Sequence, residues 1–287
     1  MLPGFYEHYE LYKKFFEIKE KFPEYFREDC NIYCLYGNFQ VCPWDGGRIF
    51  SSEIKTASLE KMQEVLDFYN KKLNLPIRYV FTNSLLTEEH CYDKYCNLIL
   101  ELGKNYHNEV VINSPILEKY IRTNYPSYAI ISSTTKCLKN SEDVLNEISK
   151  DYKLICLEHS LNKNVQLLNN IPQEYRNKVE ILVNPICKIG CPNKEEHYRL
   201  NSLFNLNFGK TYALYECKIK EEVLHPNHFN KQCISPEYIN DIYLPLGITH
   251  MKIEGRTFTS TNLIAVLAKY LVKPEYQLSF ISFMSYN

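Results

Sequence analysis

The chain alternates short apolar runs with helical patterns along its whole length, and this alternation constrains the fold more than any other feature. The apolar runs are rich in β-branched residues and occupy residues 31–37, 77–84, 109–115, 128–134, 154–160, 179–185, 211–216 and 248–256. Such runs are typical of strands that are buried on both faces. Strands that alternate with helices form a parallel sheet, so the pattern predicts a (β/α)8 barrel of the TIM type.

Two variants of this architecture stay open. The barrel can be incomplete or distorted, and a doubly wound open sheet shows the same alternation of strands and helices. No G-x-G-x-x-G motif follows an early strand, which disfavours the dinucleotide-binding form of the open sheet. No linker rich in Gly, Ser or Pro divides the sequence. We therefore expect residues 1–287 to form a single barrel domain.

The charge and hydropathy of the chain argue against two classes of partner. The formal net charge is −1, whereas proteins that coat nucleic acid carry a large positive excess, so we expect no binding to bulk nucleic acid. No apolar run reaches about 18 residues, and the first 22 residues carry charges throughout. We therefore expect neither a membrane span nor a secretory signal, and a cytoplasmic location.

The cysteine count points to metal or cluster chemistry. The chain has eleven cysteines, an odd number that argues against a purely disulfide framework. Cys187 and Cys191 stand four residues apart on the loop after the predicted strand 179–185, and two such thiolates can reach one metal centre from a single turn. Cys156, by contrast, lies inside a predicted strand, where a free cysteine usually acts as a small buried hydrophobe.

Further thiols are needed to complete a site of this kind. Cys217 follows the predicted strand 211–216, and Cys233 lies on the connection that leads to the last strand. The uneven spacing of these cysteines suits an iron-sulfur cluster that is assembled from separate loops. Cys42, which follows the first predicted strand, is a fifth candidate ligand of the metal site.

Polar residues stand at the C-terminal ends of the predicted strands, which in a barrel meet on the rim that carries active sites. Three of them are expected to cap helices, namely Ser114, Ser133 and Thr257. Four others are poor caps and are expected to act in function or in ion pairs, namely Glu158, His159, Glu254 and Arg256.

Two segments in the second half of the chain resemble a known family. Residues 233–270 contain a Ser-Pro-Glu sequence, a helix, a Gly-hydrophobic turn and the strand end K-I-E-G-R. Residues 178–187 read KVEILVNPIC, in which a strand that bears Glu180 leads into Cys187. Both segments are similar to motifs of the collagenase-like peptidase family.

This resemblance implies a barrel that carries a four-cysteine iron-sulfur cluster, which we expect to contain four irons and four sulfides. The implied ligands are Cys187, Cys191, Cys217 and Cys233, with Cys42 as the alternative to Cys233. Better-understood members of the family support oxygen-independent hydroxylation of tRNA, ribosomal RNA or a ubiquinone precursor, and others have been named peptidases.

Two hypotheses of different classes follow. In the first, the chain is an iron-sulfur enzyme with a hydroxylase-like activity. Arg256 and Lys252 hold an acidic group, because the guanidinium fork suits a carboxylate, and Glu254, His197 or His250 transfers protons. In the second, the chain is a non-catalytic accessory protein that uses its cluster structurally or for electron transfer to a redox partner. A peptidase-like hydrolase is less favoured, since neither G-x-S-x-G nor H-E-x-x-H occurs.

Overall fold

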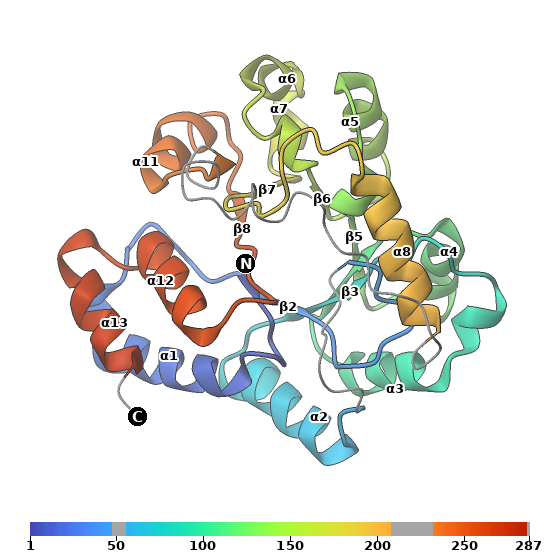
Figure 1. The fold of residues 1–287 in the computed structure, drawn as a ribbon, viewed down its shortest axis with the longest axis horizontal. Helices are drawn as coiled ribbons and strands as arrows, with labels where there is room; N and C mark the ends of the chain where they lie inside the picture. The colour runs from blue at the N-terminus through green and yellow to red at the C-terminus, as the bar shows by residue number, and fades with distance from the viewer. Residues whose placement is uncertain (48–55, 208–231, 286–287) are drawn as a thin grey trace.

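The computed structural model describes residues 1–47, 56–207 and 232–285. In these residues eight parallel strands form one sheet in the order β1 to β8. The strands are β1 Leu2–Pro3, β2 Leu35–Gly37, β3 Ile77–Phe81, β4 Glu109–Ile112, β5 Ala129–Ser132, β6 Leu154–Cys156, β7 Val179–Leu182 and β8 His250–Lys252. Helices surround the ring of strands (Figure 1). The predicted (β/α)8 barrel is therefore confirmed.

The helices follow the strands in the expected alternation. The α-helices of the described residues are α1 Tyr9–Lys21, α2 Leu59–Leu66, α3 Lys94–Gly103, α4 Pro115–Asn124, α5 Ser141–Ile148, α6 Val165–Asn170, α7 Gln173–Arg176, α8 Lys194–Leu206, α11 Pro236–Tyr238, α12 Ser260–Leu271 and α13 Gln277–Ser285. Two short turns matter below, the 3₁₀ turn η4 Thr134–Lys136 and the π turn η6 Ile239–Tyr243.

The ring closes between β1 and β8 without a regular ladder in the described residues. The nitrogen of Met1 donates to the carbonyl of Met251 (2.7 Å), and the amide of Ile253 donates to the carbonyl of Met1 (3.1 Å). Because β1 has only two residues, these two bonds take the place of a full strand pairing. The barrel is therefore distorted at this seam, which is one of the variants that the sequence left open.

The seam also accounts for the strand that sequence analysis missed. β1 was not predicted, because a two-residue strand that contains a proline gives no detectable periodicity. The predicted strand 211–216 lies outside the described residues. β7 pairs directly with β8, with Glu180 opposite His250 and Leu182 opposite Lys252. The ring is thus complete at eight strands within the described part of the chain.

Each strand turns one face to the barrel interior and the other to the helices, as a strand period of two requires. On β3, Tyr79 and Phe81 join the large core between the sheet and the helices. Val80 belongs to a smaller cluster inside the barrel. Arg78, on the same inner face, has no solvent exposure. The interior of this barrel is therefore partly ionic.

Two of the three expected helix caps are confirmed. The side chain of Ser114 accepts from the amide of Leu117 at the start of α4, and that of Ser133 accepts from Thr135 at the start of η4. Thr259, two residues beyond the predicted Thr257, caps α12. The cap was misplaced because the chain makes an additional turn after β8 before the helix begins.

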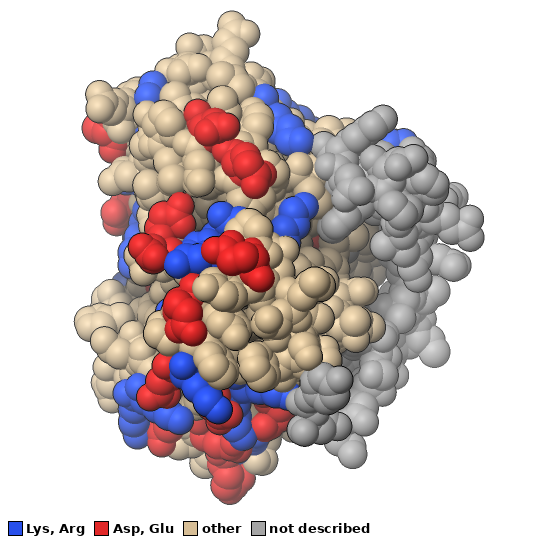
Figure 2. Space-filling view, turned by 90° about the vertical axis from the view of Figure 1, so that its left-hand side faces the viewer, with Lys and Arg blue, Asp and Glu red and all other residues tan. Residues whose placement is uncertain are grey.

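The surface agrees with the balanced composition of the chain. On the face shown in Figure 2, the described residues present Lys and Arg interspersed with Asp and Glu rather than one continuous region of either sign. Some of these charges form pairs, such as Lys273 with Glu28 at 2.9 Å. In the described residues no helix is both long enough and apolar enough to cross a bilayer.

Candidate functional site

A cavity of about 90 Å³ opens at the C-terminal ends of the strands. Its floor is apolar and comes from the inner faces of β3, β4 and β7, through Val80, Val111 and Leu182. Its walls carry ionisable and hydroxyl groups, namely Tyr36, Thr82, Ser133, Thr134, Thr135, Cys156, His159, Cys187, Tyr198, Lys252, Glu254, Arg256 and Thr257. The structure thus brings Cys187 together with the three charged residues of the K-I-E-G-R strand end.

Arg256 lies between two carboxylates at the edge of this cavity. Its Nη2 donates to Oδ2 of Asp45 at 2.7 Å, and its Nε lies 3.8 Å from Oε1 of Glu7. Asp45 follows β2 and Glu7 follows β1, so both reach the same rim as Arg256. The Arg256 side chain is only 5% exposed, so these contacts fix the position of its positive charge.

Glu7 has the most perturbed environment of this group. Burial raises the pKa of its carboxyl group to about 7, Asp45 adds to the rise, and Arg256 opposes it. Among the described residues, its buried Oε2 has no hydrogen-bond partner. A Cβ atom on Gly4 or Gly37 would lie 3.2 Å from this oxygen. The two glycines therefore leave the space that the carboxyl group occupies.

Lys252 is held from below by an ionic chain inside the barrel. Its Nζ lies 3.2 Å from Oε1 of Glu180, whose other oxygen accepts from Arg78. Arg78 also donates to Glu109 at 2.7 Å. Burial alone would raise the pKa of Glu180, but Arg78 and Lys252 together lower it to about 2. Glu180 is therefore ionised, and it keeps the ammonium group of Lys252 at the cavity floor.

Glu254 connects β8 to the loop that carries the first cysteine pair. Its Oε2 accepts from the amide of Ile186 at 3.0 Å, one residue before Cys187. The side chain of Asn184 forms two further bonds with the backbone of Glu254, at 2.8 Å and 2.6 Å. Glu254 therefore positions the Cys187 loop in addition to lining the cavity.

A second buried ion cluster follows β6. Oε1 of Glu158 lies 2.9 Å from Nδ1 of His159 and also contacts the Nζ of Lys194. Burial would raise the pKa of Glu158, but His159 and Lys194 hold it well below its usual range. Lys194 is the first residue of α8. This cluster therefore attaches the start of α8, just after the cysteine loop, to the wall of the cavity.

The far end of α8 packs on the loops after β2 and β3. The side chain of Asn205 donates to the carbonyl of Asp45 at 2.6 Å, and that of Asn83 donates to the carbonyl of Ser202 at 2.9 Å. A Cβ atom on Gly46 would lie 2.6 Å from Oγ of Ser202 and 2.6 Å from backbone atoms of Thr82 and Asn83, in the loop after β3. Only glycine therefore fits this contact. α8 thus runs from the end of β6 to the β2 and β3 loops (Figure 1), and its Tyr198 lines the cavity.

The predicted proton-transfer histidines lie apart from each other. His197 is half-buried on α8, next to Tyr198, and it is not among the described residues that line the cavity. His250 begins β8 and faces the opposite end of the barrel. The role of His197 stays a prediction, while Glu254 is the predicted proton-transfer group that the structure places in the cavity.

The predicted cysteine ligands are described in part. Cys187 and Cys191 are half-buried on one turn, where the amide of Cys191 donates to the carbonyl of Lys188 at 3.2 Å. Cys233 is buried beside the end of β7, because the next residue donates to the carbonyl of Val183 at 2.7 Å. Two half-buried thiols on one rim turn are donors that suit a cluster. Cys217 lies outside the described residues.

Two observations bear on the remaining thiols. In the described part of the chain, no group of three or more His, Cys, Asp or Glu side chains is placed to hold a metal ion. Cys42 is buried in the outer core, and its sulfur lies 3.4 Å from that of Cys96. Cys96 lies on α3, so the thiol of Cys42 contacts another thiol in the outer core.

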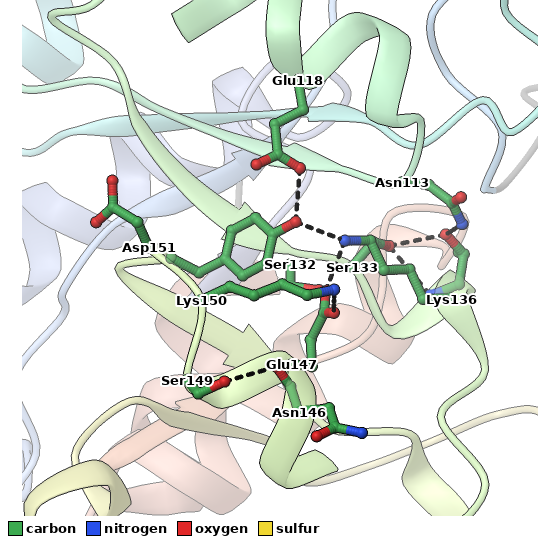
Figure 3. Close-up of polar contacts among 12 residues, drawn as sticks. Asn113, Glu118, Ser132, Ser133, Lys136, Asn146, Glu147, Ser149, Lys150 and Asp151 are labelled. Carbon is green, nitrogen blue, oxygen red and sulfur yellow. Dashed lines mark hydrogen bonds and ion pairs between the residues drawn. The ribbon is translucent and has the colours of Figure 1, made fainter. Parts of the chain in front are cut away.

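A polar network outside the rim joins α4 and α5 (Figure 3). Lys136 donates to Glu147 at 2.6 Å and to the hydroxyl of Tyr152 at 3.0 Å, and Tyr152 donates to Glu118 at 2.5 Å. Burial would raise the pKa of Glu147, but Lys136, Lys150 and Ser132 lower it to about 2. The positive and negative charges of this network neutralise one another. Through Glu118 and Glu147 the network connects α4 and α5, and the bond from Ser132 to Glu147 connects α5 to β5.

Sequence analysis did not identify Glu7, Asp45 or Lys194 as site residues. Glu7 follows a strand too short to detect, and Asp45 lies eight residues after the end of β2. Charge was the one sequence feature that pointed to Glu7 and Asp45. Both acids lie near the rim that the barrel prediction implies, and a buried Arg256 requires a carboxylate partner.

No protein-family model matches the sequence, and no curated protein matches it. Among solved structures, that of the U32 peptidase Mk0906 matches with a TM-score of 0.47 and 14% identity, over 67% of this chain and 76% of that chain. U32 peptidases are the collagenase-like family that the C-terminal motifs resemble. At this identity and TM-score, the likeness assigns no residue role and no chemistry.

Proposed function

We propose that the chain is an iron-sulfur enzyme that acts on a small acidic molecule in the rim cavity. The observation that supports this most directly is that Cys187 lines the same cavity as Lys252, Glu254 and Arg256. A thiol that suits a cluster therefore stands beside two cations that suit an acidic group. Oxygen-independent hydroxylation is the reaction that the motif resemblance favours.

Each residue has a distinct part in this proposal. Arg256 and Lys252 bind the acidic group, and both are already held by carboxylates at 2.7 Å and 3.2 Å. A fixed cation loses little conformational freedom when it binds a ligand. Glu254 moves a proton at its carboxylate, and α8 with Tyr198 limits the access of water. When bound, the cluster would supply one-electron chemistry; because hydroxylation without O2 oxidises the substrate by two electrons, these electrons would pass to a redox partner or to an organic oxygen donor.

The cofactor can be tested on protein purified without oxygen. We expect iron and sulfide in the purified protein and a broad absorption band near about 400 nm. Cys187→Ser or Cys191→Ser removes both the iron and the band. Cys34→Ser is the matched control, because this thiol is buried inside the barrel and does not line the rim cavity. A colourless protein that contains zinc would overturn the proposal.

The same preparation separates an enzyme from an accessory protein. In the enzyme, Glu254→Gln retains the iron and loses turnover, whereas an accessory protein with a structural or electron-transfer cluster has no turnover to lose. If iron is present but no acidic metabolite from a defined mixture is consumed without oxygen in the presence of an electron acceptor, the accessory hypothesis is preferred.

A further inference from the structure

A second cavity, of about 140 Å³, lies at the opposite end of the barrel from the rim. It forms where the seam between β1 and β8 meets residues 27–33 and the turn η6. The cavity is larger than the rim cavity, and none of the described residues lines both. Its position follows from the short β1, which leaves the start of this seam without a strand partner.

The wall of this cavity is mainly apolar. The apolar side chains come from both seam strands and from the surrounding helices, and they include Leu2, Ile32, Ile239, Met251, Tyr270 and Leu271. Polar side chains also line it, among them Arg27, Asp29, Asn31, Asn240, Thr249 and His250. An apolar pocket with a few convergent polar groups is the usual form of a small-molecule site.

Arg27 carries a donor that lacks an acceptor. In the described residues its Nε is buried and has no hydrogen-bond partner, while its backbone amide is fixed to the carbonyl of Leu271 at 3.0 Å. Glu237, which interacts with Arg27, and Asp29, which also lines the cavity, are exposed residues, where ion pairs are weak. A buried donor that is left unpaired normally signals a missing partner.

His250 supplies the second polar group at the inner end of the cavity. Its ring meets that of Tyr33 edge to face, with centroids 5.3 Å apart. Tyr33 in turn donates to Glu109 at 2.6 Å and covers Arg78, with 5.7 Å between the guanidinium carbon and the ring centroid. Tyr33 and His250 therefore separate this cavity from the ionic chain inside the barrel, and the cavity is closed at that end.

We propose that this cavity binds a small monocarboxylate with an apolar chain. The carboxylate pairs with the guanidinium of Arg27 and with the imidazole of His250, and the chain lies against the apolar wall. Arg27 lines the cavity, and an anion is the acceptor that a guanidinium favours. This site does not depend on the rim chemistry, so the two proposals stand or fall separately.

Isothermal titration calorimetry of the whole protein with butanoate, hexanoate and octanoate tests the site. We expect saturable binding that tightens with chain length, and binding of 1-hexanol at least about tenfold weaker than that of hexanoate, because the charge-assisted bond is lost. Equal binding of hexanol and hexanoate would overturn the carboxylate assignment. The absence of saturable binding by any chain length at millimolar concentration would overturn the site.

Two variants locate the binding. Arg27→Gln should weaken hexanoate binding at least about tenfold, whereas Arg199→Gln, which removes an exposed arginine from α8, should leave it unchanged. Ile239→Trp fills the cavity and should abolish binding while the circular dichroism spectrum stays that of the parent. Hexanoate binding that survives both Arg27→Gln and Ile239→Trp lies elsewhere, and the proposal is then wrong.

Discussion

Glu7→Gln tests the electrostatics of the rim most directly. In the folded protein, burial raises the pKa of Glu7 from an ordinary value of 4.5 to about 7. Between these two pH values the folded state keeps a proton that the unfolded state has lost, so the free energy of unfolding falls as pH rises through this window. At about 1.4 kcal/mol per pH unit, the whole window corresponds to about 3 kcal/mol. Glutamine stays neutral, and the variant should lack this loss.

Urea unfolding at pH 4.5 and at pH 8 measures the effect. The parent should lose about 3 kcal/mol more than Glu7→Gln between these pH values, and the two proteins should have similar stability at the lower pH. The titratable groups that interact with Glu7 include Arg256, Asp45, Tyr6, Tyr12 and Tyr69, and all of them are unchanged in the variant. Glu20→Gln, at an exposed position of α1, is the control and should follow the parent. Identical pH dependence of parent and Glu7→Gln would refute the reasoning.

Four further outcomes are expected. Gly46→Ala should destabilise the protein by about 1–3 kcal/mol, because its Cβ overpacks the contact between α8 and the β2 and β3 loops. Gly47→Ala should be tolerated, since its nearest neighbours are 3.6 Å away; equal thermal unfolding of the two variants would contradict this. Arg256→Lys should weaken calorimetric binding of succinate, as the bidentate fork is lost; unchanged affinity with lower thermal stability would make Arg256 an ion-pairing residue only. Glu180→Gln should cost about 3–5 kcal/mol in urea unfolding, because it leaves buried cations uncompensated, whereas Glu196→Gln, which breaks an exposed pair, should cost under about 1 kcal/mol. Filter binding at physiological salt should show no submicromolar affinity for random RNA, because the net charge is −1.

The sequence was informative about the fold where a signal is local. Short apolar runs predicted β2 to β8, because near-continuous apolar residues suit a strand that is buried on both faces. β1 escaped detection because two residues carry no period. The packing of α8 over the rim cavity was not predicted either. Its buried Asn201 and Asn205 look in sequence like residues of a solvent-exposed helix face. Their side chains in fact donate to the backbone carbonyls of Gly47 and Asp45.

The ionic chain inside the barrel was visible in the sequence but was not interpreted. Arg78, Glu109, Glu180 and Lys252 each lie within a run that is otherwise apolar. A charge in a strand that is buried on both faces must be paired, and the four alternate in sign along their contacts, from Glu109 through Arg78 and Glu180 to Lys252. Register was the missing information, because a shift of one residue would turn each charge toward the helices instead of its partner.

Glu7 also links the stability of the fold to the function proposed for the rim. An anion bound to Arg256 would lie close to Glu7 and would favour its protonated form, and such coupling is reciprocal. The anion should therefore bind more tightly below pH 7, where Glu7 is protonated and no longer competes for the charge of Arg256. A neutral ligand would not show this dependence. If Arg256 only joined Glu7 and Asp45, stability would still change with pH but ligand affinity would not. The pH profile of binding thus separates a guanidinium that recognises substrate from one that only closes the barrel.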